Sequence, residues 1–143
     1  MLAGAWGTEW YFGYQHPHSD LSCEDWRSRD LFWDMGKICI DFFYNNDLPV
    51  DKMVCKDELV SSEGDYCYAL EGDTYVVFLK KGGESTLDLK NNSGNFSVLW
   101  YDTRNGGELQ KGEVKTIQGG GKKSLGMPPK EVNKDWVVLV KKI

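Results

Sequence analysis

Apolar and polar side chains alternate most clearly between residues 95 and 101, which read NFSVLWY. Successive side chains of a strand point to opposite faces, so Phe96, Val98 and Trp100 share one face. That face is wholly apolar and is expected in a core. The other face mixes polar and apolar residues and is expected to be covered only in part. A strand with one such face needs a second layer to bury it, which predicts a layered β structure.

Further short strands are predicted through the second half of the chain. The Asn-Gly pair within residues 102–107 tolerates positive φ and predicts a turn, from which the chain returns as a strand. Turns every ~8–12 residues are typical of a sandwich or barrel, so we expect a mainly β fold, an antiparallel β-sandwich of about seven strands. The expected strands cover residues 65–70, 74–80, 85–89, 95–101, 108–118, 122–125 and 135–142, the last of which closes the sheet.

Residues 22–44 have the spacing of one long helix. Ser22 is a suitable N-cap, and Asp25 stands three residues later as in a variant of the capping box. Apolar residues recur at three- and four-residue intervals in two stripes. The first stripe has Phe32, Met35, Cys39, Phe42 and Phe43, and the second has Trp26, Trp33 and Ile40. A helix that is apolar on two sides either packs on both or has lost a neighbour.

Charge and composition narrow the classes of partner. The net charge of −5 disfavours nucleic acid and anionic membrane surfaces. Apolar runs of ~18 residues are absent, so no membrane insertion is expected. The first residues lack the basic start of a secretory signal, and the sequence begins as if in the middle of a protein. Aromatics make up 13% of the chain, with six Trp, which favours a large interface with another domain or a flat ligand such as a sugar.

The four cysteines give no metal or redox motif. They are Cys23, Cys39, Cys55 and Cys67, and no two have C-x-x-C spacing. We expect free, buried thiols, although three full disulfide pairings are open to four cysteines. The glycine run at residues 119–121 is not followed by the Lys-Ser/Thr of a phosphate loop, so no cofactor is expected.

Candidate ligand contacts lie in the aromatic N-terminal stretch, where flat rings could stack on sugar faces or pack at an interface. A glycosidase needs two carboxyl groups at a defined separation. Glu9 is a weak candidate for one of them, but it has no evident second member and also suits an ion pair with Arg27 or Arg29. The His-x-His pair could start a zinc site, yet its Pro-containing loop favours a solvated or substrate-facing position, and no metal is expected. The candidate ligand residues are therefore Trp6, Trp10, Tyr11, Tyr14, His16 and His18.

The turn sequence WYDTRNGGEL, followed by PP and DWVVLV, resembles the C-terminal β-sandwich of a bacterial glycoside-hydrolase-like family. That module is known as a collagen-binding domain of a collagenase, and its usual turn reads Trp-Tyr-Asp-Pro-Arg-Thr-Gly. Trp100, Tyr101, Asp102, Arg104 and Gly106 match it, while Thr103 and Asn105 replace the usual Pro and Thr. We expect Trp100, Tyr101 and Trp136 in a core or interface. Asp102 and Arg104 are expected to hold the turn by a side-chain cap and an ion pair.

The stretch AGAWGTEWYFGYQHPHSDLSCEDWRSRDLFWD resembles the segment before that module, at the end of the family's (β/α)8 barrel. The resemblance implies three parts: a barrel remnant in residues 1–49, a linker in residues 50–64 and an accessory β-sandwich in residues 65–143. Most of the barrel is absent from this chain. The catalytic carboxylates of such barrels come from earlier strands, so the resemblance implies a chain without the main catalytic apparatus.

The resemblance thus implies a non-catalytic accessory module that packs on a barrel. Carbohydrate binding by this module is a further expectation. It also implies an extracellular or cell-envelope location. Alternatives are a stand-alone carbohydrate- or collagen-binding module, and a glycosidase fragment that contributes barrel-end substrate contacts. The apolar helix and N-terminal aromatics would expose a large apolar surface in a monomer. We therefore expect that surface to pack on the missing barrel or in a homodimer.

Overall fold

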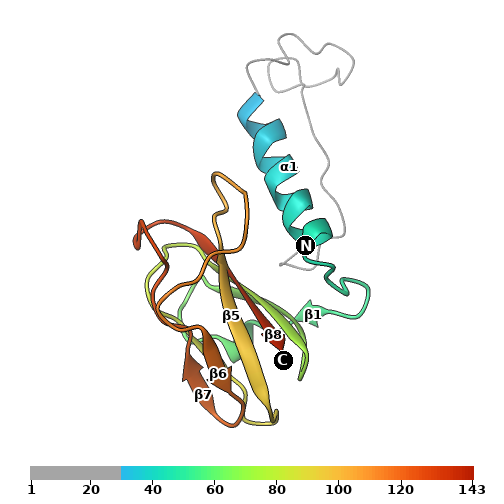
Figure 1. Cartoon of the computed structure of the whole chain (residues 1–143), viewed down its shortest axis with the longest axis vertical. Coiled ribbons are helices and arrows are strands. Elements are labelled where there is room, and N and C mark those ends of the chain that lie inside the picture. Colours follow the sequence, from blue (N-terminus) through green and yellow to red (C-terminus); the bar gives the residue numbers. More distant parts are fainter. Residues whose placement is uncertain (1–29) are drawn as a thin grey trace.

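The computed structural model describes residues 30–143, which form one helix and two antiparallel sheets (Figure 1). Strands β1, β2, β3, β8, β5 and β6 follow one another across a six-stranded sheet, and β4 pairs with β7 in a two-stranded sheet. The elements are α1 (Asp30–Asn45), β1 (Val54–Cys55), the 3-10 turn η2 (Asp57–Leu59), β2 (Tyr66–Leu70), β3 (Thr74–Leu79), β4 (Thr86–Asp88), β5 (Asn95–Tyr101), β6 (Thr116–Gln118), β7 (Lys122–Ser124) and β8 (Trp136–Lys142). The expected mainly β, sandwich-like fold with a long helix is confirmed.

Strand β8 lies in the middle of the large sheet, between β3 and β5. Its register places Val138 opposite Val77 of β3 and Trp100 of β5. The strand expected over residues 135–142 is present, and its place between β3 and β5 is a finding of the structure. The sequence WVVLV is an uninterrupted apolar run because both faces of this strand are covered, and a strand covered on both faces need not alternate with polar residues.

The inner face of the large sheet holds the main core. Phe96, Val98 and Trp100 of β5 are fully buried there, as their alternation predicts. The two-stranded sheet and its flanking loops cover them with Leu87, Leu89 and Leu125. Apolar surface removed from water contributes about 25 cal/mol per Å², so the burial of these side chains strongly favours folding. The rest of the buried cluster consists of Cys67, Ala69, Tyr75, Val77, Leu79, Ile117, Trp136, Val138 and Val140.

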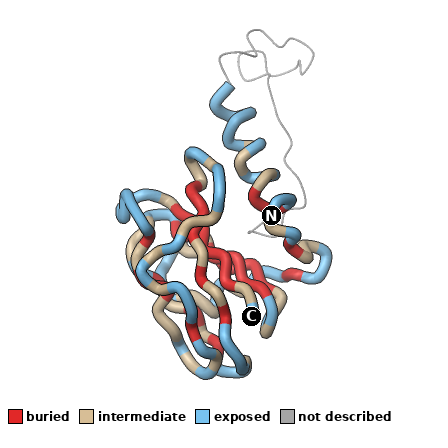
Figure 2. The backbone as a smooth tube through the Cα atoms, viewed as in Figure 1, coloured by how far each residue is buried: buried red, intermediate tan, exposed pale blue. Residues whose placement is uncertain are grey.

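The outer face of the same sheet is buried by the C-terminal end of α1 and the segment that follows it. Phe42 and Phe43 are buried against this face. Figure 2 shows the buried positions of α1 at the end nearest the sheet and exposed positions toward its other end. The Tyr101 hydroxyl donates to the Ile38 carbonyl over 3.0 Å, and the Tyr68 hydroxyl donates to the Val50 carbonyl over 2.7 Å. Two tyrosines of the sheet therefore hold the helix and its exit segment in place. The cluster also contains Leu48, Met53, Val76, Val137 and Leu139.

The return from β5 is shorter and less regular than the strand expected over residues 108–118. Gln110 forms an isolated bridge with Trp100, and regular pairing resumes at β6. Between them, Gly112 packs against the Trp100 indole, where an added Cβ would lie 2.3 Å from Trp100 Nε1 and 2.8 Å from the Met127 carbonyl oxygen. A side chain at position 112 would therefore clash with the Trp100 ring, so the chain passes over this ring at a glycine.

The segment at residues 50–64, expected to be an irregular linker, contributes β1 to the edge of the large sheet and contains η2. The division of the chain into three parts, with boundaries at residues 49/50 and 64/65, stays a prediction. The expected helix cap, at Ser22 and Asp25, and residues 1–29 of the expected barrel remnant lie outside the described residues. Helix α1 ends at Asn45, one residue after the expected end. Among residues 30–143, no helix combines the length and apolarity that a membrane crossing requires.

Leu87 tests whether the small sheet closes the inner core. It is fully buried in β4, so Leu87→Ala should lower the free energy of unfolding by about 2–5 kcal/mol through lost contacts and a residual cavity. Val54 in β1 is 54% exposed, and Val54→Ala should change the free energy of unfolding by less than about 0.5 kcal/mol. Urea unfolding followed by Trp fluorescence measures both, and equal effects would contradict this account of the core.

Candidate functional site

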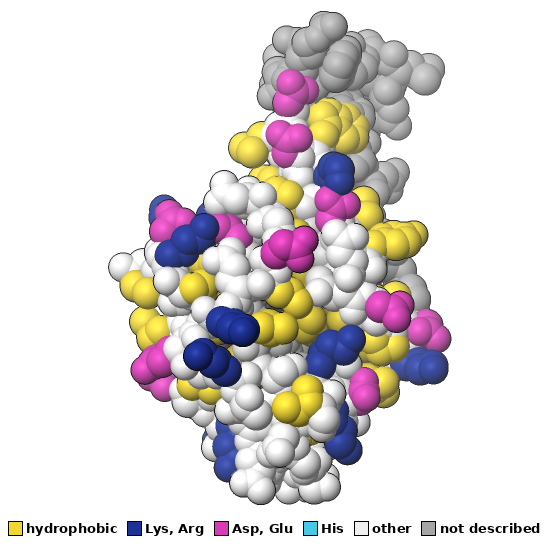
Figure 3. Space-filling view, in the orientation of Figure 1, with side chains coloured by type: hydrophobic (Ala, Val, Ile, Leu, Met, Phe, Trp, Pro, Cys, Tyr) yellow, Lys and Arg dark blue, Asp and Glu magenta, His cyan; other side chains and the backbone are white. Residues whose placement is uncertain are grey.

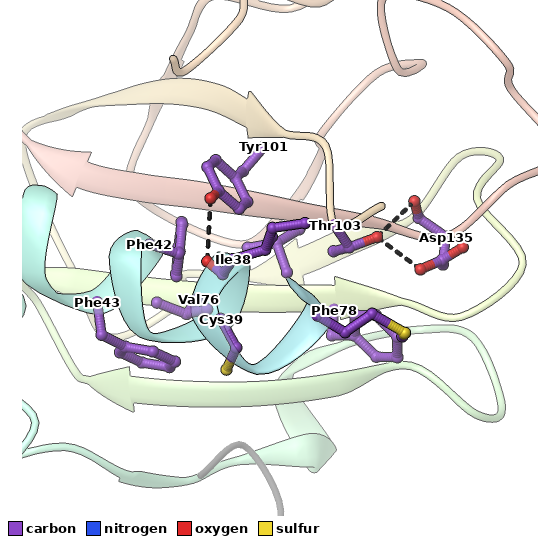
Figure 4. A pocket seen from close by; sticks show the side chains of 11 residues that line it. Ile38, Cys39, Phe42, Phe43, Val76, Phe78, Tyr101, Thr103 and Asp135 are labelled. Carbon is purple, nitrogen blue, oxygen red and sulfur yellow. Dashed lines mark hydrogen bonds between the residues drawn. The ribbon is translucent and has the colours of Figure 1, made fainter. Parts of the chain in front are cut away.

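An apolar cleft of about 320 Å³ separates α1 from the outer face of the large sheet (Figure 4). Helix α1 supplies one wall, and strands β3 and β8 supply the other. The cleft exists because α1 meets the sheet at its C-terminal end and rises away from it toward its N-terminal end (Figure 1). Its lining consists of Met35, Ile38, Cys39, Phe42, Phe43, Val76, Phe78, Tyr101, Thr103, Asp135 and Val137.

Exposure along α1 follows this geometry. Phe42 and Phe43 are 3% and 8% exposed, and the Phe42 ring lies 4.8 Å from the Tyr101 ring. Nearer the start of the helix, Leu31 is 70% exposed and Met35 is 50% exposed. The helix therefore offers apolar side chains beyond the point where the sheet covers it. Phe32, Trp33, Ile40 and Tyr44 are exposed on it as well.

The cleft has one polar end, formed by Thr103 and Asp135. The Thr103 hydroxyl donates to Asp135 Oδ2 over 2.5 Å and lies 3.1 Å from the Asp135 carbonyl oxygen. These contacts join the turn after β5 to the residue before β8. The polar end therefore lies where β5 ends and β8 begins.

Asp102 organises the turn that carries Thr103. Its carboxylate is buried and accepts hydrogen bonds from the Arg104 amide at 3.1 Å, the Asn105 amide at 3.2 Å and the Asn105 side chain at 3.0 Å. An Asp side chain that bonds the amides two and three residues later is a typical turn former. Gly106 closes the turn with its amide 2.8 Å from the Asp102 carbonyl oxygen. Its φ of 67° lies in the left-handed region that favours glycine.

The tip of this turn lies against α1. A Cβ on Gly106 would meet Ile38 Cγ1 at 3.2 Å and the Tyr101 hydroxyl at 3.4 Å. The same Tyr101 hydroxyl bonds to the Ile38 backbone. The turn, the last residue of β5 and the middle of the helix thus form one contact at the side of the cleft.

A cluster of ion pairs connects the turn to residues 130–135. Arg104 Nη2 lies 3.2 Å from Asp102 Oδ1 and 3.2 Å from Glu131 Oε2, and its Nη1 lies 4.0 Å from Asp135 Oδ1. Lys130 Nζ lies 3.4 Å from Asp102 Oδ2. The guanidinium also lies over the Trp136 ring, 5.3 Å from its centroid, as in a cation–π contact.

This environment sets the protonation of Asp102. Burial alone would raise the pKa of the carboxyl, but hydrogen bonds from Asn105 and from the Arg104 and Asn105 amides, together with the Arg104 charge, outweigh it. The pKa of Asp102 therefore lies below its ordinary value, and the group stays ionised. A general acid needs a raised pKa, so Asp102 has the electrostatics of a structural group.

The residues expected from sequence divide between described and undescribed parts of the chain. Trp6, Glu9, Trp10, Tyr11, Tyr14, His16, His18 and Cys23 lie outside the described residues. Trp100 and Trp136 lie in the inner core with ring centroids 6.2 Å apart, and Tyr101 lies in the outer cluster. Cys67 is buried with a free thiol, whose pKa is raised to about 12, first by burial and then by nearby carboxylates, whereas Cys39 is free but exposed. Within residues 30–143, no three His, Cys, Asp or Glu side chains form a metal-binding group.

Sequence reasoning missed the cleft and its polar end. Met35 and Phe42 belong to the expected apolar stripe, but that stripe gives no hint of a gap beneath it. Asp135 reads as an ordinary charged residue before a strand. The continuous apolar run of β8 was the available signal, because it indicates that a second layer lies on the outer face.

Comparisons with known proteins agree with this architecture. A family model described as "Putative collagen-binding domain of a collagenase" matches residues 48–141. A solved structure described as a glycoside hydrolase is 15% identical, with a TM-score of 0.61 over 85% of this chain and 26% of its own. A family 5 glycoside hydrolase from Bacteroides vulgatus ATCC 8482 is 16% identical, with a TM-score of 0.61 over 85% of this chain and 25% of its own.

The chain thus spans about a quarter of the length of each of these solved structures. At such identities the likeness shows a shared fold. No curated protein matches the chain.

Asp102 tests the turn. Asp102→Ala should lower the free energy of unfolding at pH 7 by about 3–5 kcal/mol, because it leaves the Arg104 and Asn105 amides without their acceptor and removes the buried carboxylate from the ion-pair cluster around Arg104. The exposed Asp51 provides a control, and Asp51→Ala should cost less than about 0.5 kcal/mol.

The pH dependence gives a second readout of the same group. A lowered folded pKa contributes stability that is present above the unfolded pKa and is lost as the pH falls through the folded pKa. The difference in the free energy of unfolding between the wild type and Asp102→Ala should therefore become smaller below about pH 4. Urea unfolding at pH 7, 4 and 3 measures it, and a constant gap would show that the carboxylate charge contributes nothing.

Proposed function

The chain belongs to the family described as a collagen-binding domain of a collagenase, and on that basis we propose that it is a non-catalytic accessory module of a glycoside-hydrolase-like protein. In this proposal, the β-sandwich packs against a catalytic barrel through α1 and the cleft beside it. Support comes from the family match and from the glycoside hydrolase structures whose fold it shares over a quarter of their length.

The observation that carries the proposal is the exposed apolar surface of α1. Leu31, Phe32 and Met35 are each at least half exposed, on a helix whose other end is buried in the outer cluster. Contiguous apolar surfaces on soluble proteins usually mark an interaction site. A barrel that precedes the module would lie next to this end of the helix. A second copy of the chain is the competing partner.

A non-catalytic role also fits the carboxylates of the site. Asp102 is buried and held ionised by its hydrogen bonds, and Asp135 accepts a hydrogen bond from Thr103 while lying near Arg104. Both serve to join the turn after β5 to the start of β8. Glycoside hydrolysis instead requires one carboxyl kept protonated and a second one at a fixed distance from it.

Glycan binding by exposed aromatic rings is a second candidate activity. Tyr44 is 82% exposed on α1, and an exposed ring with a polar tip suits the face of a sugar. The aromatic residues of the N-terminal stretch, Trp6, Trp10, Tyr11 and Tyr14, would extend such a surface. The family description adds collagen as a ligand to be tested in the same assay.

The partner prediction is tested with any (β/α)8 barrel that a genomic search finds encoded beside this chain. Co-expression of the two should give a 1:1 complex by light scattering. Leu31→Glu should weaken the complex at least about tenfold, because it buries a charge in an apolar contact. Ile143→Glu is the matched control, since Ile143 is 73% exposed and lies at the other end of the chain. Absence of a complex, or equal weakening by both variants, would refute packing through α1.

The glycan prediction is tested by titrating plant and algal polysaccharides, and collagen, against the chain while following Trp fluorescence. At least one polysaccharide should change the emission, and Tyr44→Ala should reduce its affinity. A polyethylene glycol solution of equal viscosity controls for non-specific effects. No change across the panel would reject glycan binding, and release of reducing sugars by the chain alone would reject the non-catalytic role.

A further inference from the structure

We propose that the cleft between α1 and the large sheet receives a bulky apolar side chain from the partner, flanked by a Lys or Arg that pairs with Asp135. This inference rests on the proposed function, because it specifies the chemistry of the surface that meets the cleft. The occupant is therefore a basic-flanked apolar segment of another protein domain, rather than a second copy of this chain.

The walls of the cleft define its apolar part. Met35 and Ile38 line it from α1, and Phe78 and Val137 line it from the sheet. Its volume of about 320 Å³ is within the range of pockets that enclose ligand groups. Protein interfaces place their strongest contacts where a large side chain of one partner fills a desolvated pocket of the other. An aromatic or long aliphatic side chain meets these requirements.

The polar end of the cleft defines the charge that the partner should carry there. Asp135 Oδ2 accepts the Thr103 hydroxyl, whereas Oδ1 lies 4.0 Å from Arg104 Nη1, which is beyond hydrogen-bond distance. The Asp135 side chain is 36% exposed. A carboxylate oxygen can accept more than one hydrogen bond, so Asp135 can accept a donor from a partner. A charged donor gives the shorter and stronger bond.

The surroundings of Asp135 carry excess negative charge. Three carboxylates, of Asp102, Glu131 and Asp135, share two cations, of Arg104 and Lys130. Figure 3 shows acidic and hydrophobic side chains together on the part of α1 that rises above the sheet. On that helix the acidic residues are Asp30, Asp34 and Asp41, and the single Lys37 pairs with Asp41.

This charge distribution discriminates between the two partners. A second copy would bring the same acidic helix and its net charge of −5 toward the cleft, and like charges placed across an interface oppose association. A basic segment would instead be attracted and oriented by the same field. Electrostatics therefore favours the different partner, and specifically one with a cation beside its apolar anchor.

The test uses short capped peptides as probes of the intact chain. One peptide has a central Trp between two Lys residues, and its matched partner has Glu in place of Lys. The Met35 methyl group lines the cleft, so its NMR signal should shift with the Lys peptide, while that of Met127, which is not part of the lining, stays in place. The Lys peptide should bind at least about tenfold more tightly than the Glu peptide.

Variants locate the binding. Met35→Lys should reduce affinity for the Lys peptide at least about tenfold, because it removes an apolar wall and adds a like charge. Ile40→Lys makes the same charge change at a similarly exposed position of α1 that does not line the cleft, and it should have a much smaller effect. Asp135→Asn keeps an acceptor for Thr103 but should reduce the preference for Lys over Glu.

Four results would overturn the proposal: no binding of the Lys peptide at millimolar concentration, equal binding of the two peptides, equal loss in Met35→Lys and Ile40→Lys, or a homodimer that Met35→Lys alone abolishes. These results are separable from failure of the proposed function. A 1:1 barrel complex without peptide binding would support the accessory role and refute this cleft chemistry. Peptide binding without a barrel complex would support this cleft chemistry and refute the accessory role.

Discussion

The structure depends on burying both faces of one sheet. Strand β8 lies at the centre of it, with Trp136, Val138 and Val140 on the inner face and Val137 and Leu139 on the outer face. The small β4–β7 sheet covers the first face, and the C-terminal end of α1 covers the second. An uncovered outer face would leave large apolar residues in water at a cost of about 25 cal/mol per Å². The helix is therefore as much a part of the fold as the strands are.

The same requirement produces the candidate site. The helix covers the outer face with Phe42 and Phe43, and its earlier part leaves the sheet at an angle, so an apolar cleft opens between them. The turn after β5 supplies the polar end of that cleft, because Asp102 fixes the turn and Thr103 reaches Asp135. A feature required for folding, the outer cluster, thus ends in the cleft at which we propose that a partner binds.

Much of the β structure follows from local sequence patterns. Alternation places Phe96, Val98 and Trp100 on a buried face, and Asn-Gly marks the turn after Tyr101, because both features depend on neighbouring residues. The central position of β8 and the cleft depend on contacts between distant residues. Tyr101 is buried because α1 arrives from some sixty positions earlier, as the bond from its hydroxyl to Ile38 shows. The Arg104 ion pairs likewise depend on Glu131 and Asp135, and no local period of the sequence encodes such pairings.

Native-state hydrogen exchange tests the two-sided burial most directly. If the outer cluster is part of the cooperative core, the amides of Phe42 and Phe43 should exchange with nearly the same opening free energy as that of Val138 in β8, since all three would require global unfolding. The account would be contradicted if the two phenylalanine amides exchanged through a local opening several kcal/mol lower while Val138 kept full protection.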